Sequence, residues 1–312
     1  TEANKKGLQS LSPEKMHELT RLYPAVAVDV ARARIFDIDP ATQKRINTLA
    51  IAAHGLLYRS RRKRRPMAAI MHFLAQGYPR LFRRLWPYVT LALVIFTVGT
   101  MGSYVAARLK PSNAYLFVPG DMDFADGEAG VTAADISERF RKMEKPPMAA
   151  GITVNNISVA LNAFALGITA GIGTCYLMLF NSMMLGGFAA HFANHGLAYE
   201  FWSFIAPHGC LEIFAIMVAA AAGLRIGLSL AMPGDLKRSA SLRTGAAEAV
   251  MLVLGTVPMF IVAGLVEGFI TPSYIPGAVK IFLGVSLLLT TLAYLMFAGS
   301  GKQVQPASRN TA

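Results

Sequence analysis

The sequence predicts an all-α fold: a polytopic membrane helix bundle of about six spans, with an N-terminal cytoplasmic helical hairpin. Apolar residues make up 54% of the 312-residue chain and charged residues only 15%, whereas a soluble globular domain usually carries about a quarter charged residues. The apolar residues are concentrated after Leu85 in runs long enough to cross a bilayer core of about 30 Å. We therefore expect lipid to surround most of the chain.

The basic residues are unevenly placed. Thirty Lys and Arg against 18 Asp and Glu give a net charge of +12, which in a soluble protein would make nucleic acid the first partner to consider. Here no acidic residue lies between Asp39 and Asp121, and the basic residues ahead of the first apolar run include Arg61, Arg62, Lys63, Arg64, Arg65, Arg80, Arg83 and Arg84. Such a cluster keeps its flank in the cytoplasm and can hold anionic lipid headgroups. Membrane lipids, and no nucleic acid, are the expected partners.

Two helices are predicted ahead of this cluster. Ser12 and Pro13 form a helix start, with a capping serine and a proline in the first turn, and apolar residues at helical spacing continue to about Ile35. Asp39 and Pro40 open a second helix in the same way. Two short amphipathic helices joined by a tight link should pack as a hairpin.

A third stretch, from Met67 to Arg84, carries apolar residues on one face and polar residues on another. It predicts a helix in the cytoplasmic interface, kinked near Gly77 and Pro79, with a third helix of a soluble bundle as the alternative. Residues 1–84 are thus expected to form a cytoplasmic helical region that includes this interfacial helix.

The apolar runs predict where the chain crosses the membrane. The expected spans are 85–107, 157–180, 181–198, 203–226, 245–270 and 277–297. The third is interrupted by His191, Asn194 and His195, so five spans are the alternative. The linker near Arg238 has a basic excess and should be cytoplasmic, which requires the third segment to cross. Gly255 and Pro258 predict a kink in the fifth span.

This topology divides the chain into regions. Residues 85–300 form the expected transmembrane domain, with an extracytoplasmic loop at 108–152, and residues 301–312 form a cytoplasmic tail. Both termini are then cytoplasmic, and the expected location is the bacterial inner membrane. A first transmembrane helix that serves as its own insertion signal is expected, because no signal peptide precedes it.

Polar residues inside the spans are the candidate site, because burying them in lipid is costly. His208 and Glu212 are one helical turn apart, and the topology brings them to the depth of the other three members of the expected polar cluster, Asn156, Asn162 and Glu267. Interhelical hydrogen bonding is the favoured role, with a transport path, proton relay or metal site as alternatives. No HExxH motif occurs, so we predict no catalytic residue, no bound metal and no cofactor.

Small residues recur in the second expected span. Ala163, Gly167 and Gly171 are spaced four apart, the pattern that lets two helix backbones approach closely. The helix contact lies either within one chain or between two copies. Because symmetric dimers are the commonest oligomers, a homodimer is expected.

Several stretches also occur in a characteristic order. They are Leu22-Tyr23, Asp29-Val30-Ala31-Arg32-Ala33-Arg34, Asn47-Thr48-Leu49, Ala53-His54, Leu57-Tyr58-Arg59, Asn155-Asn156-Ile157-Ser158-Val159-Ala160, His208-Gly209-Cys210-Leu211-Glu212, Ala221-Ala222-Gly223-Leu224, Pro233-Gly234 and Glu267-Gly268-Phe269-Ile270-Thr271-Pro272. In these stretches the chain resembles the stage II sporulation protein M family of integral membrane proteins. The resemblance extends from about Leu11 to Pro272. Longer members of that family usually begin with a further helical stretch that is not seen here.

The resemblance implies a function. Sporulating members are scaffolds in septal and engulfing membrane remodelling that localise peptidoglycan-degrading cell-wall enzymes without catalysis of their own, and longer relatives tend to accompany MoxR-type ATPases and RDD-type membrane proteins. The leading hypothesis is therefore a non-enzymatic scaffold or assembly factor of membrane remodelling and cell-envelope morphogenesis. A small transporter, channel or lipid-handling protein that uses the His208 and Glu212 cluster is the alternative, and an intramembrane hydrolase is the weakest.

Overall fold

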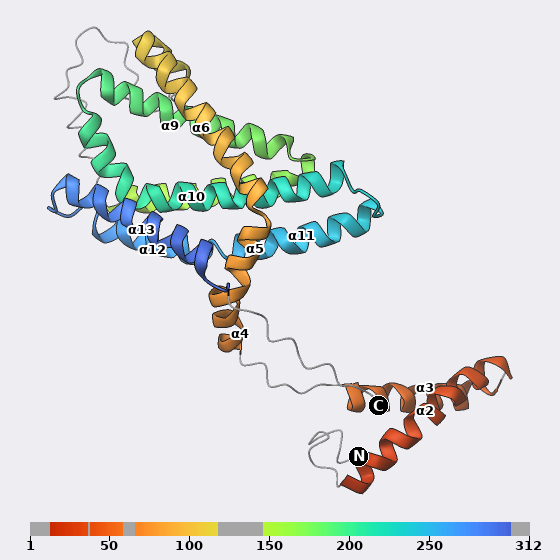
Figure 1. The fold of residues 1–312 in the computed structure, drawn as a ribbon. Helices are drawn as coiled ribbons and strands as arrows, with labels where there is room; N and C mark the ends of the chain where they lie inside the picture. The colour runs from red at the N-terminus through yellow and green to blue at the C-terminus, as the bar shows by residue number, and fades with distance from the viewer. Residues whose placement is uncertain (1–12, 37, 59–65, 118–145, 301–312) are drawn as a thin grey trace. The chain divides into compact units, whose positions relative to one another are not determined.

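The computed structural model describes residues 13–36, 38–58, 66–117 and 146–300. These residues form helices and turns with no strand among them, which confirms the all-α prediction (Figure 1). The chain divides into two compact units, Thr1–Ala69 and Ile70–Ala312. Each unit is described by itself.

The first unit contains the two predicted helices, α2 (Pro13–Ile35) and α3 (Pro40–Tyr58), which pack against each other. Asp39 caps the start of α3: its Oδ2 accepts hydrogen bonds from the backbone N–H and the hydroxyl of Thr42, each at 3.0 Å. Among the described residues of this unit, Ala33 alone is buried. The hairpin therefore lacks a core of large side chains over its described part.

The second unit is entered through a helix that changes its winding. α4 (Pro66–His72), within which the division between the units falls, is followed by the π-helical turn η2 (Phe73–Gly77), by α5 (Tyr78–Arg84) and by α6 (Trp86–Leu109). The π-turn is the irregularity at the position where Gly77 and Pro79 predicted a kink. A short 3-10 helix, η3 (Pro111–Leu116), follows α6.

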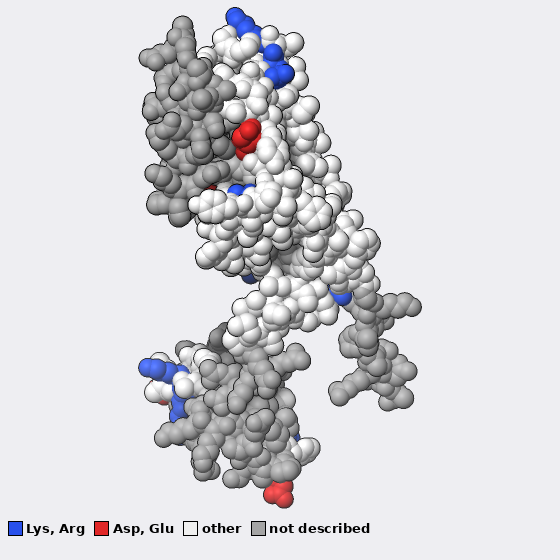
Figure 2. All heavy atoms as spheres, turned by 90° about the vertical axis from the view of Figure 1, so that its left-hand side faces the viewer, with Lys and Arg blue, Asp and Glu red and all other residues white. Residues whose placement is uncertain are grey.

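Six helices of the described residues are long and apolar enough to cross a membrane, as predicted. They are α6, α8 (Pro146–Ala165) with the 3-10 turn η4 (Leu166–Thr169), α9 (Ile172–Asn194), α10 (Ala198–Ala231), α11 (Arg238–Leu254) with α12 (Val257–Phe269), and α13 (Gly277–Phe297). The predicted kink in the fifth span is the break between α11 and α12 at Gly255, with Pro258 in the first turn of α12. In Figure 2 the described surface of this unit consists largely of uncharged residues, as expected beside lipid.

The predicted border between the second and third spans is wrong. The chain was expected to continue as one helix through residues 157–180, but it turns at Ala170 and Gly171, whose φ angles are 55° and 85°. Glycine adopts this left-handed conformation readily, and the Thr169 hydroxyl accepts a hydrogen bond from the Gly173 N–H at 2.8 Å. An apolar turn this short has no hydropathy signal. The segment with His191 is therefore the end of a full-length helix, α9, and not a weak span of its own.

Helix α10 is the centre of the second unit. It contacts α6, α8, α9, α11, α12 and α13, and most of its residues are buried. The run Ala219–Ala222 is fully buried, and such small side chains allow neighbouring backbones to approach closely. Pro207 lies inside α10, where it removes a backbone donor, and Figure 1 shows the helix bending in its N-terminal part. Gly284 of α13 packs against the α10 backbone at Ala206 and Pro207.

Helices α8 and α10 run parallel and in register. Asn156 of α8 contacts Glu212 of α10, and 11 residues further along each helix Gly167 packs against the backbone of Gly223. Two parallel neighbours require the helix between them in sequence, α9, to return in the opposite direction. This pairing gives a geometric reason for six spans instead of five.

Candidate functional site

The candidate site is a buried cluster of His208, Glu212 and Glu267, which two helices supply. His208 and Glu212 lie one turn apart on α10, immediately after Pro207, while Glu267 lies in the last turn of α12. The exposed fractions of the three residues are 1%, 0% and 1%. Helix α8 covers the cluster with Thr153 and Asn156.

Each carboxylate is held by one of its two oxygens. The Asn156 side-chain amide donates to Glu212 Oε2 at 2.6 Å, and the Thr153 hydroxyl donates to Glu267 Oε2. The other oxygen of each carboxylate, Oε1, is buried and has no hydrogen-bond partner among the described residues. Buried polar atoms normally have a partner, so two such oxygens in one cluster require an explanation.

His208 is fixed by its surroundings. Its Nδ1 lies 3.3 Å from the Thr271 hydroxyl, and the Phe204 ring meets the imidazole edge-on at a centroid distance of 5.9 Å. Its Nε2 lies 3.9 Å from Glu267 Oε1, too far for a hydrogen bond. One ligand atom from each of His208, Glu212 and Glu267 can be chosen so that all lie within 4.8 Å of one another.

Four of the five predicted cluster residues are brought together, and Asn162 is not. Asn156 contacts Glu212, and His208, Glu212 and Glu267 converge. Asn162 is exposed, because it lies six residues after Asn156, about 1.7 helical turns, and so points away from α10.

Sequence reasoning missed Thr153, Thr271 and Lys280. Thr153 precedes Asn156 by three residues and so shares its helix face. Thr271 follows α12, and its backbone carbonyl accepts a hydrogen bond of 2.5 Å from Lys280 Nζ in the first turn of α13. Lys280 is buried although it stands at the start of an apolar run. A lone lysine at the start of an apolar run was a signal in the sequence for including α13.

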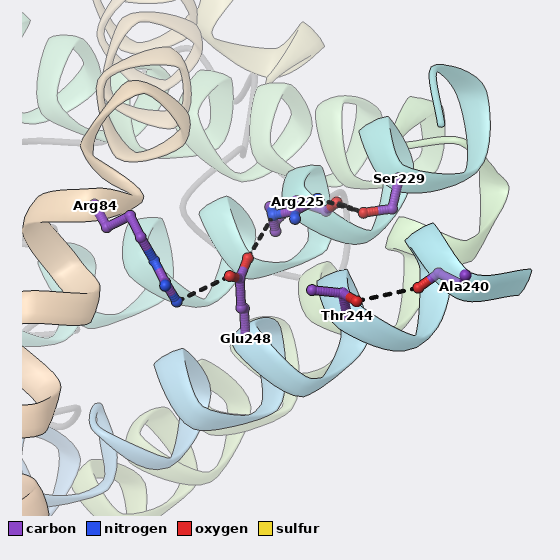
Figure 3. Close-up of polar contacts among 6 residues, drawn as sticks. All are labelled: Arg84, Arg225, Ser229, Ala240, Thr244 and Glu248. Carbon is purple, nitrogen blue, oxygen red and sulfur yellow. Dashed lines mark hydrogen bonds and ion pairs between the residues drawn. The ribbon is translucent and has the colours of Figure 1, made fainter. Parts of the chain in front are cut away.

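A second polar cluster, also missed from the sequence, joins α5, α10 and α11 (Figure 3). Glu248 of α11 forms ion pairs of 2.8 Å with both Arg84 and Arg225. Arg225 also donates to the Ser229 hydroxyl and lies 5.9 Å from the centre of the Tyr88 ring. The side chains of Arg225 and Glu248 are 19% and 18% exposed, whereas that of Arg84 is 63% exposed.

The basic residues predicted to hold lipid headgroups fall into three groups. Arg61, Arg62, Lys63, Arg64 and Arg65 lie outside the described residues. Arg80 donates to the Gly299 carbonyl at 2.7 Å, and Arg83 donates to the carbonyls of Leu295 and Met296 at 2.6 and 3.1 Å. These two guanidinium groups therefore bind the C-terminal end of α13, where a positive charge is favourable. Lipid binding by the exposed Arg84 stays a prediction.

The predicted small-residue stripe makes its close contact inside the chain. Ala163 and Gly167 are buried against α10, and Gly171 packs beside Gly227. A Cβ atom at Gly167 would overlap the backbone of Gly223. The stripe is therefore covered by α10 and offers no face to a second copy.

Residues 89–272, more than half of the chain, match the family described as Stage II sporulation protein M. This range includes His208, Glu212, Glu267 and Asn156, and it ends before Lys280. No curated protein and no solved structure matches the chain.

Proposed function

The chain belongs to the stage II sporulation protein M family, and from this membership we propose that it is a non-enzymatic membrane scaffold or assembly factor of the cell envelope. The observation that carries the proposal is the surface of the α2–α3 hairpin. Large apolar side chains there are exposed, including Leu22, Val28, Ile35, Phe36, Leu49 and Ile51. A soluble unit seldom exposes so many unless they form an interaction site.

A protein partner fits this surface. Exposed apolar residues on helices are recognised by docking one helix face into a groove of the partner. The partner classes that follow from the family resemblance are MoxR-type ATPases, RDD-type membrane proteins and cell-wall enzymes. The proposed setting is the bacterial inner membrane with both termini, and so the hairpin, in the cytoplasm. A homodimer is a separate proposal that would need a contact other than the small-residue stripe.

The membrane domain supports a structural role. The ionisable residues of the buried cluster, His208, Glu212 and Glu267, are 0–1% exposed, and each glutamate receives a hydrogen bond from α8. Hydrogen bonds between helices of this kind fix packing in membranes. On this proposal the membrane domain is a rigid base that holds the hairpin at the membrane, and no residue carries out catalysis.

The alternative function, lipid handling or transport, is favoured by one observation. An apolar cavity of about 440 Å³ lies between η2, α5, α12 and α13, with Tyr78, Met259 and Tyr294 in its lining. An acyl chain would fit such a cavity. Lipid scrambling and ion flux measured in liposomes, with Glu212→Gln as the comparison, test this alternative, and activity in the wild type that Glu212→Gln abolishes would favour it over the scaffold.

The scaffold proposal is tested by crosslinking the full chain in native membranes and identifying the proteins attached to it. Phe36→Asp with Ile51→Asp should remove specific partners, because both side chains are exposed and apolar. Lys44→Gln, a change at an exposed polar position of the same hairpin, should retain them. A partner list that is the same for all three proteins would overturn the proposal.

A further inference from the structure

We infer that His208, Glu212 and Glu267 form a binding site for one divalent transition-metal ion inside the membrane domain. The inference rests on the geometry of these residues and does not depend on the scaffold role. It concerns a site that the two helices α10 and α12 build and that α8 covers.

The ligand atoms are close to the spacing that a metal ion requires. One nitrogen and two carboxylate oxygens lie within 4.8 Å of one another. An ion such as Zn²⁺ lies about 2.0–2.2 Å from nitrogen and oxygen ligands, so bound ligand atoms are about 3–3.5 Å apart. Binding of an ion would therefore draw the ligand atoms together by up to about 1–2 Å through rotation about the glutamate side-chain bonds.

The two unpartnered oxygens are the second observation. Glu212 Oε1 and Glu267 Oε1 are buried without a hydrogen-bond partner among the described residues, an arrangement that is costly for an ionised carboxylate. A bound divalent cation would coordinate both oxygens. It would also balance two negative charges in a region surrounded by lipid, where isolated charges are unfavourable.

The atoms that face away from the centre are held as they are in metal sites. Asn156 and Thr153 each donate to the outer oxygen of one glutamate, and the Thr271 hydroxyl lies beside His208 Nδ1. Because Nδ1 faces the Thr271 hydroxyl, the other ring nitrogen, Nε2, is the one that would bind the metal ion. It is the nitrogen that lies 3.9 Å from Glu267 Oε1. Such outer partners orient metal ligands and raise their affinity for the ion.

Lys280 is the obvious competing cation, and its contacts argue against it. Its Nζ donates a hydrogen bond of 2.5 Å to the Thr271 carbonyl. Among the described residues no ion pair joins Lys280 to Glu212 or Glu267. A proton shared between the two carboxylates is the other competitor. The experiment below separates it from a metal ion.

The ligand set indicates the kind of ion. Imidazole nitrogen favours transition metals, while Mg²⁺ and Ca²⁺ prefer oxygen ligands alone. One histidine with two carboxylates therefore points to Zn²⁺ or Mn²⁺. The ion would cross-link α10 to α12 near the end of α12, so its expected effect is stabilisation of the bundle.

The test uses the full chain purified in detergent, stripped with a chelator and then incubated with Zn²⁺, Mn²⁺ or Mg²⁺. We expect one equivalent of Zn²⁺ or Mn²⁺ per chain by elemental analysis, none of Mg²⁺, and a rise in the thermal unfolding temperature with the bound ion. Glu212→Gln and Glu267→Gln should abolish both effects. Glu200→Gln, which removes an exposed carboxylate from the same helix α10, should abolish neither.

Asn156→Ala supplies a milder variant that keeps all three ligands. Loss of an outer partner should weaken ion affinity by about 10–100-fold without abolishing binding. If a glutamate variant fails to fold, this variant and the wild-type measurements still decide the question. Wild-type protein that takes up no Zn²⁺ or Mn²⁺ would overturn the inference in favour of a shared proton. Uptake that is equal in the wild type, Asn156→Ala and both Gln variants would overturn it by placing the ion elsewhere on the protein.

Discussion

The Asn156 side-chain amide donates a hydrogen bond of 2.6 Å to Glu212 Oε2 and so joins α8 to α10. Asn156→Ala should lower the free energy of unfolding by about 0.5–2 kcal/mol, the range for hydrogen bonds between membrane helices. Asn162→Ala, at an exposed position of the same helix, is the matched control and should have no effect. Unfolding of the detergent-solubilised protein measures both, and equal losses would show that the bond does not stabilise the contact.

The two ion pairs of Glu248 should differ in strength. Arg225 and Glu248 are both less than one fifth exposed, whereas Arg84 is 63% exposed. Double-mutant cycles should therefore give a coupling of about 0.5–3 kcal/mol for Arg225 with Glu248 and less than about 1 kcal/mol for Arg84 with Glu248. Added salt should weaken the second coupling more than the first. A stronger coupling to Arg84 would contradict this assignment.

The glycine contact between η4 and α10 predicts a strong size limit at Gly167. A Cβ atom there would lie 2.7 Å from Gly223 Cα, so Gly167→Ala should destabilise the protein by about 1–3 kcal/mol, as overpacking does. Gly102→Ala in α6, where a Cβ atom meets nothing within 4 Å, is the control and should be tolerated.

The same pair of variants tests whether the small-residue stripe serves a dimer. Because the stripe is covered by α10, light scattering should give the same oligomeric state for wild type, Gly167→Ala and Gly102→Ala. Dissociation caused by Gly167→Ala alone would instead place the stripe between two copies.

The cap of α3 predicts a pH dependence. Hydrogen bonds from Thr42, its backbone N–H first, lower the pKa of Asp39 below the ordinary value of 3.8. Because the folded-state pKa is lowered, the cap stabilises α3 at neutral pH and this contribution is lost as the pH falls below 3.8. Protection of the Thr42 amide from hydrogen exchange should therefore fall in the wild type as the pH drops below 3.8. In Asp39→Ala, which lacks the cap, exchange of this amide should already be faster at neutral pH.

Asp39→Asn is the control for this prediction. Asparagine keeps the capping oxygen but does not titrate, so protection of the Thr42 amide should persist and should not depend on pH in this way. An Asp39→Ala variant that exchanges as slowly as wild type would show that the cap contributes nothing measurable.

The sequence predicted the features that depend on composition and helical spacing. Hydropathy together with the basic excess of the linker near Arg238 gives six spans, and a spacing of four puts His208 and Glu212 on one face of α10. The sequence could not predict the turn at Ala170 and Gly171, because both residues are as apolar as the helices they join. Asn162 was misassigned because depth in the membrane was considered without the direction of its side chain around α8.

The partners from distant elements were missed for a related reason. Arg225 and Glu248 pair across two helices, and Lys280 reaches the cluster from α13. Each of these residues looked like the charged edge of an apolar run. Only the packing of the helices shows that Arg225 pairs with Glu248, and that Lys280 binds the carbonyl of Thr271, whose hydroxyl lies beside His208.

The contacts of α13 with the segment that precedes the first span have a consequence for biosynthesis. Arg80 and Arg83 bind carbonyls at the end of α13, and the Tyr294 hydroxyl donates to the carbonyl of Leu74. A ribosome makes Leu74, Arg80 and Arg83 before any of the spans, and it makes Tyr294 only within the sixth. Until α13 has been made, the segment that contains Leu74, Arg80 and Arg83 lacks these partners. The insertion machinery therefore handles an incomplete bundle until the sixth helix arrives, and a chain that stops short of α13 would lack all of these contacts.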